Sequence, residues 1–101
     1  MLLSTADRLV LLSILPQEGN ITDLKIIRKI KDDLSFDEAE HKICNFRNED
    51  DQVKWDAGLP DKEVTFGEKA TDIIAEAFKR LNVQRKLREE HVPLYDKFVT
   101  V

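Results

Sequence analysis

The longest regular hydrophobic pattern covers residues 65–81. Its apolar positions recur with the 3.6-residue period of one helix face, and they are Phe66, Ala70, Ile73, Ile74, Ala77, Phe78 and Leu81. Charged side chains occupy the opposite face. Thr65 and Glu68 have the spacing of a capping box, in which a hydroxyl accepts from the amide three residues later. The pattern predicts one long helix with a single face on the core.

A first helix is expected to begin at Ser4 and to end before Pro16. Ser4 has a capping side chain, Asp7 is favourable near the positive end of a helix, and the residue before a proline rarely stays helical. Residues 9–15 are apolar on nearly all sides. This helix therefore carries more apolar surface than one small core requires, and Leu11 is a candidate for contact with a partner.

Two further helices should follow. Asn20 or Thr22 caps the first of them, which should run to about Asp33. Residues 35–38 read Ser-Phe-Asp-Glu, which has the spacing of a second capping box and predicts a new short helix. Phe36 and Ala39 would face inward from it.

The apolar period changes from 3.6 to 2 after residue 43. Apolar and polar residues alternate around 44–47, 52–55 and 64–66, which predicts three short strands. Residues 48–51 are polar and suit a hairpin turn. Short connections favour antiparallel pairing, so we expect a small antiparallel three-stranded sheet.

The C-terminal segment has helical spacing again. Residues 82–86 predict a break, with Asn82 as a left-handed cap. Leu94, Tyr95 and Phe98 then lie on one side of a short last helix. These side chains are too apolar to stay in water, so they either fold back on the first helix or dock on a second copy or a partner. We favour folding back because short connections usually join neighbours in space.

Together these elements predict a single α+β domain over residues 1–101, because shorter halves could not each bury a core. The order is typical of a winged-helix-like fold, with three N-terminal helices, a small antiparallel three-stranded sheet, a long helix and a short C-terminal helix. Fold alone does not give function.

The net charge of −4 is concentrated in the middle of the chain, where residues 35–66 hold four basic and nine acidic side chains. A winged helix that binds DNA places its third helix in the major groove. Here that helix would present Asp37, Glu38 and Glu40 against Lys42, and carboxylates repel phosphates. Nucleic-acid binding is therefore disfavoured.

No pattern of catalytic, cofactor-binding or metal-ligating residues is present. The chain has one cysteine, Cys44, and two histidines, His41 and His91, which do not make a zinc site or a recognisable triad. The acidic residues 49–51 are interpreted as a solvated turn. The start of the chain does not resemble a signal peptide, and residues 9–15 are too short to cross a bilayer. We expect a cytoplasmic protein without enzymatic activity.

Three further stretches carry a resemblance. They are Leu15-Pro16-Gln17-Glu18-Gly19-Asn20, Phe66-Gly67-Glu68-Lys69-Ala70 and His91-Val92-Pro93-Leu94-Tyr95-Asp96-Lys97-Phe98. With them the chain resembles, over almost its whole length, small uncharacterised proteins encoded by bacteriophages and prophages. The resemblance implies a phage context and no particular activity.

The functional hypothesis is a protein-interaction module that binds a host or phage protein or a second copy of itself. Trp55, beside the acidic turn, is the large aromatic residue that could anchor a partner, and Leu11, Leu94, Tyr95 and Phe98 are the other candidates. The alternative is a winged-helix nucleic-acid-binding regulator, whose positive face would combine the basic residues of 25–31 and 80–88.

Overall fold

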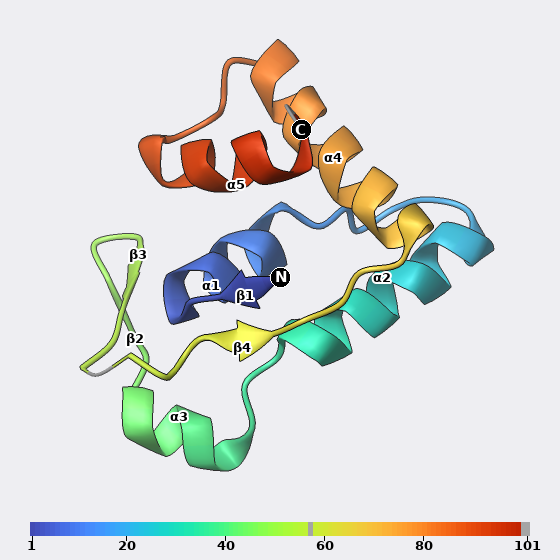
Figure 1. Cartoon of the computed structure of the whole chain (residues 1–101). Coiled ribbons are helices and arrows are strands. Elements are labelled where there is room, and N and C mark those ends of the chain that lie inside the picture. Colours follow the sequence, from blue (N-terminus) through green and yellow to red (C-terminus); the bar gives the residue numbers. More distant parts are fainter. Residues whose placement is uncertain (57, 100–101) are drawn as a thin grey trace.

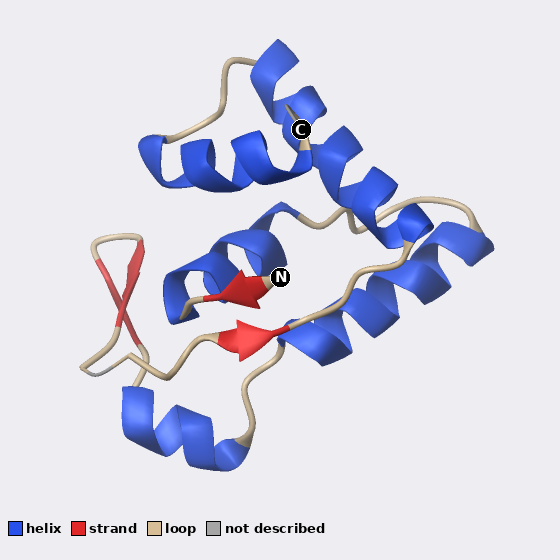
Figure 2. Cartoon of the chain, in the orientation of Figure 1, coloured by secondary structure: helices blue, strands red, loops and turns tan. Residues whose placement is uncertain are grey.

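The computed structural model describes residues 1–56 and 58–99. In this part of the chain the fold is mixed, with five α-helices, one 3-10 turn and two small antiparallel sheets of two strands each (Figures 1 and 2). The elements in chain order are β1 (Leu2–Leu3), α1 (Thr5–Ile14), α2 (Ile21–Leu34), α3 (Glu38–Cys44), β2 (Arg47–Glu49), β3 (Gln52–Lys54), β4 (Lys62–Glu63), α4 (Glu68–Val83), the 3-10 turn η1 (Glu89–His91) and α5 (Val92–Phe98).

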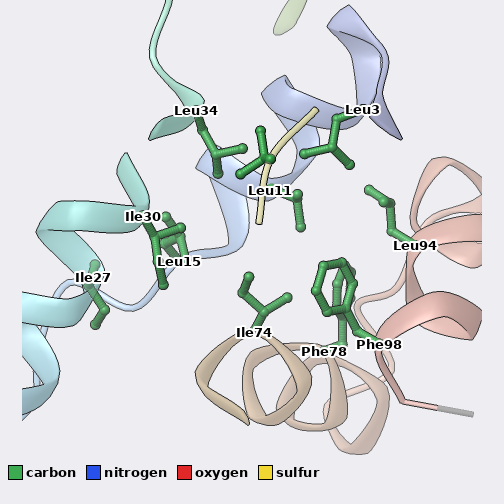
Figure 3. Packing of buried hydrophobic residues seen from close by; sticks show 11 residues of the cluster. Leu3, Leu11, Leu15, Ile27, Ile30, Leu34, Ile74, Phe78, Leu94 and Phe98 are labelled. Atoms are coloured by element: carbon green, nitrogen blue, oxygen red, sulfur yellow. The ribbon is translucent and has the colours of Figure 1, made fainter. Parts of the chain in front are cut away.

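The core lies where α1, α2, α4 and α5 meet, and Figure 3 shows its side chains converging from these helices. Its buried apolar residues are Leu3, Leu11, Leu15, Ile27, Ile30, Leu34, Val64, Ile74, Phe78, Leu94 and Phe98. The predicted inner face of the long helix is confirmed at its centre, because Ile74 and Phe78 are fully buried.

The C-terminal segment folds back onto the domain, but α5 packs mainly on α4 and not on the first helix as predicted (Figure 1). The rings of Phe98 and Phe78 stack with centroids 6.2 Å apart. Leu94 belongs to the same core as Leu11 of α1 (Figure 3). Pro93 is tolerated because it lies in the first turn of α5, where its missing N–H has no partner to lose.

The predicted three-stranded sheet is not found among residues 1–56 and 58–99. β1 pairs with β4, with Leu2 opposite Glu63, and β2 pairs separately with β3. Residues 64–66 are not a strand, and Val64 lies in the core. A strand as short as Leu2–Leu3 shows no period of two, so the sequence pattern could not reveal it. The winged-helix arrangement, which needs the strands in one sheet, is not confirmed.

Two of the five predicted helix caps are found, and the other three positions do not cap a helix as predicted. Ser4 and Asp7 form the capping box of α1, and Asn20 caps α2. Helix α3 is capped by Asp37 rather than Ser35, because the box pairs Asp37 with Glu40. Ser35 instead donates its hydroxyl to the carbonyl of residue 31 at the end of α2.

The shift of α3 changes which of its side chains are buried. Ala39, predicted to face inward, is exposed, and Phe36 is half-buried just before the helix. Cys44 is fully buried, as expected of a small hydrophobic residue, but it ends α3 and is not in a strand.

Helix α4 also begins and ends later than predicted. Its cap is Gly67, without a side-chain hydrogen bond, so the expected box at Thr65 is absent. The left-handed residue after the helix is Arg85, with φ of 57°, and not Asn82. The amide of Lys86 donates to the carbonyl of Leu81, and that of Arg85 to the carbonyl of Asn82. This is a Schellman ending with an arginine where glycine is usual.

Candidate functional site

Arg8 holds α1 to the next two helices. Its side chain is 1% exposed, and its Nε donates to the carbonyl of Leu34 at 3.1 Å. One terminal nitrogen donates to the carbonyl of Ser35 at 2.6 Å, and the other lies 3.0 Å from a carboxylate oxygen of Glu40. The guanidinium also lies 3.9 Å from the centre of the Phe36 ring. Arg8 thus closes the C-terminal end of α2 and fixes the start of α3 beside α1.

The charge of Arg8 acts on Glu40. The hydrogen bond from Arg8, followed by the bond from the Asp37 amide, lowers the pKa of Glu40 below its usual 4.5. The sequence reasoning missed Arg8. The available signal was its position at helical spacing between Thr5 and Leu15, on the face that becomes buried.

Aromatic rings continue from α3 to the hairpin. The Phe36 and Phe46 rings lie 4.8 Å apart, His41 lies 5.5 Å from Phe46, and Trp55 lies 6.3 Å from Phe46, each measured between centroids. These contacts, mostly edge-on or tilted, join α3 to both sides of the hairpin base. Trp55 is therefore held on one side and half-buried.

Polar contacts fix the same hairpin base. Arg47 donates to Asp56 at 2.6 Å, Asn45 donates to the other oxygen of Asp56 at 3.1 Å, and the Asp56 amide donates to the carbonyl of Cys44. The hydrogen bonds from Asn45 and then Arg47 lower the pKa of Asp56, and Asp56 raises the pKa of Arg47. The strands β2 and β3 are thereby anchored although all their side chains are exposed.

A groove of about 310 Å³ separates the hairpin from α1 and from the start of η1. Its lining residues are Ala6, Leu9, Val10 and Ser13 of α1, Asp51, Gln52, Val53 and Trp55 of the hairpin, and Arg88 and Glu90. The α1 residues are spaced as one helix face. The lining includes apolar side chains from both α1 and the hairpin, together with the charged side chains of Asp51, Arg88 and Glu90.

The five predicted contact residues separate into three groups. Trp55 lines the groove. Leu11, Leu94 and Phe98 are 0%, 1% and 9% exposed and belong to the core, so they do not form an accessible surface in the chain. Tyr95 is half-buried against Phe78, with ring centroids 6.1 Å apart. Leu11, Leu94 and Phe98, which were predicted to contact a partner, are therefore part of the hydrophobic core.

The surplus apolar surface of α1 is real but lies on another face. Leu9 and Val10 remain half-buried beside the core and line the groove. Val53 is 43% exposed on the facing strand. The all-round apolar character of residues 9–15 was the available signal, but helical spacing alone did not tell which face the core would use.

The residues with possible chemistry are dispersed. Across residues 1–56 and 58–99, no three His, Cys, Asp or Glu side chains gather in a way that would hold a metal ion. Cys44 is a buried free thiol, and His91 accepts through Nδ1 from the Arg88 amide at 3.0 Å. His41 is exposed among the aromatic rings. Within the described ranges, none of the helices combines the length and apolar character needed to cross a bilayer.

Comparison of the chain with protein-family models, with curated proteins and with solved structures finds no match.

Proposed function

We propose that the protein is a non-enzymatic protein-interaction module and that the groove beside Trp55 is its binding site. The observation that carries the proposal is the combination of apolar side chains from two facing elements with a half-buried tryptophan. Tryptophan is enriched among the residues that dominate binding energies at interfaces. A groove between a helix and a hairpin can take an extended or helical segment of a partner.

The way the groove is built supports the same proposal. Trp55 packs on Phe46, and the hairpin base is tied down by Arg47, Asn45 and Asp56. An anchor that is already held loses little conformational freedom when a partner binds. The short strands β2 and β3 contribute no side chain to the core, so core packing does not explain their presence.

A phage context is part of the proposal. The resemblance to phage and prophage proteins suggests a small factor that acts on a host or phage protein. The resemblance does not choose between these two sources of the partner.

The rival function is nucleic-acid binding by a winged-helix-like arrangement. Against it, Lys42 of α3 lies 3.9 Å from Glu38 in the same helix, and the hairpin ends in Asp50 and Asp51. The surfaces that would meet DNA are therefore acidic or internally paired, whereas DNA binding rests on free Lys and Arg contacts to phosphates. The proposal places nucleic acid second for this reason.

Site-specific photo-crosslinking in the source cell tests the proposal. A photoreactive amino acid replaces Val53 in the groove, and a matched variant carries it at Val83, which is 82% exposed at the end of α4. We expect a discrete protein adduct from position 53 that is absent from position 83. Nucleic acid as the main adduct from position 53, together with a salt-sensitive shift of duplex DNA by the native chain, would contradict the proposal.

A further inference from the structure

We infer that the groove binds a basic amphipathic helix of the partner, with its apolar side on Val53 and Trp55 and its cationic side toward the hairpin turn. The inference rests on the proposed function and names the partner's chemistry. It is carried by the unpaired carboxylates of the hairpin turn, which lie beside the apolar lining of the groove, and by the conformation of the turn.

The hairpin turn displays unpaired negative charge. Asp50 and Asp51 are exposed, and neither carboxylate has an ion pair or hydrogen bond within the described part of the chain. Glu49 lies 3.5 Å from Arg47 Nε and shares that cation with Asp56. Asp51 lines the groove directly, next to the start of β3. An occupant of the groove therefore meets a carboxylate of the turn.

One of the two aspartates holds a position where the backbone favours another residue. Asp50 and Asp51 have φ of 51° and 63°, the left-handed conformation of a two-residue hairpin turn. Asn or Asp is preferred at the first of these positions and glycine at the second, because glycine adopts positive φ without a Cβ clash. The turn thus carries the carboxylate of Asp51 at some cost in stability. Strain of this kind is tolerated more often at functional sites than elsewhere.

Two charged residues near the start of η1 also line the groove, the cation Arg88 and the carboxylate Glu90. Arg88 makes no ion pair among residues 1–56 and 58–99. The charged side chains of the lining are therefore the carboxylates of Asp51 and Glu90 and one guanidinium, which favours an occupant with positive charge.

A second copy of this chain fits the groove less well. The basic side chains of α2, which include Lys25, Arg28 and Lys31, are exposed, but its apolar side chains Ile27 and Ile30 are in the core. Of the apolar side chains of α2 only Ile21, at its N-terminal end, is exposed. A neighbouring α2 could therefore offer charge to the turn but only one isolated apolar side chain to Trp55. A separate partner can offer both.

The test selects peptides from a random display library against the full native chain. A helix of about 14 residues is about 21 Å long, so peptides of that length suffice. We expect the selected peptides to carry apolar residues at helical spacing, with Lys or Arg on one flank. Exchange of those basic residues for Glu should weaken binding by about tenfold or more, because each like-charge contact replaces an attractive one.

Two groove variants test where the peptides bind. Val53→Lys should weaken binding by about tenfold or more, since it removes an apolar contact and adds repulsion. The double change Asp50→Asn with Asp51→Gly should weaken it by about threefold to tenfold at low salt and by much less at high salt, as expected for charges at a rim. The same double change should raise the melting temperature, so a misfolded hairpin cannot explain the loss.

Matched controls lie away from the groove. Val83→Lys repeats the apolar-to-lysine change on α4, and Glu18→Gln with Asp32→Asn repeats the loss of two exposed carboxylates. Both should change affinity by less than about twofold, because distant charges are screened.

The inference is overturned if the selected peptides are neutral or acidic, or if the groove variants bind as well as the native chain. In either case a protein adduct from position 53 would leave the proposed function standing. Concentration-dependent dimerisation that is lost in Val53→Lys would also overturn the inference, in favour of a second copy. If selection yields no binder and position 53 yields no protein adduct, the proposed function fails as well.

Discussion

Replacement of Arg8 by methionine should be one of the most destabilising single changes in the chain. Methionine is also a good helix former and fills much of the same space, so neither propensity nor a large cavity dominates the effect. The change removes the donors to the carbonyls of Leu34 and Ser35 and the partner of Glu40. The contacts that are lost are those that join α1 to the end of α2 and to α3.

The magnitude follows from the groups left behind. A buried carbonyl without a donor costs about 1–3 kcal/mol, and this applies most fully to Leu34, which is fully buried. The carbonyl of Ser35 and the carboxylate of Glu40 lie nearer the surface and can recover part of their hydrogen bonding from water. Loss of one partner of a buried ion pair commonly costs about 3–5 kcal/mol in total, and we expect Arg8→Met to fall in that range.

Urea denaturation followed by circular dichroism measures this loss. With a slope of about 1–3 kcal/mol per molar urea, the midpoint should fall by about 2 M. Glu40→Gln is the matched control. It keeps the contacts of Arg8 to both carbonyls and should cost about 1 kcal/mol. A loss below about 1 kcal/mol for Arg8→Met, or equal losses for the two variants, would refute the role assigned to the arginine.

Four further outcomes are expected. Phe78→Ala should cost about 3–5 kcal/mol in the same titration, because the side chain is fully buried. Asp37→Ala should cost about 1 kcal/mol because it removes the cap of α3, whereas Ser35→Ala should cost less than about 0.5 kcal/mol. A larger loss for Ser35→Ala than for Asp37→Ala would contradict the assignment of Asp37 as the cap. Arg85→Gly should stabilise the chain by about 1 kcal/mol or less by relieving its positive φ, and destabilisation would contradict this. The pKa of Glu40 is lowered in the folded state, so its stabilising effect should be complete above its usual pKa of 4.5 and should disappear as the pH falls through the lowered value. The native chain and Glu40→Gln should therefore converge in stability in acid.

The helices were predictable from the sequence because their signals are local. Ser4 and Asn20 act within one turn, and the apolar stripe of α4 depends only on the period of 3.6. The displaced caps show the limit of such signals. Ser35 and Asp37 both precede an acidic residue at the spacing of a box. In the folded chain the Ser35 hydroxyl is used at the end of α2, and Arg8 holds Glu40 of the second box.

The sheets and the groove depend on contacts between distant residues. β1 is two residues long, and its pairing with β4 joins positions about sixty residues apart. The division of α1 between the core and the groove depends on where α2 and α4 pack against it, which a single-helix pattern cannot show. The residue type of Trp55 and its acidic neighbours marked it as a candidate. The sequence could not show that Leu9 and Val10 line the same groove, because this depends on where the hairpin packs relative to α1.

The fluorescence of Trp55 tests the central claim most directly, because it is the only tryptophan in the chain and it lines the groove. In the free chain its half-exposed ring should be accessible to acrylamide quenching. Saturation with a tryptophan-free partner peptide should shift its emission to shorter wavelength and reduce the quenching, with the same dissociation constant that calorimetry gives. A partner that binds by calorimetry while the emission and quenching of Trp55 stay unchanged would show that the groove is not the binding site.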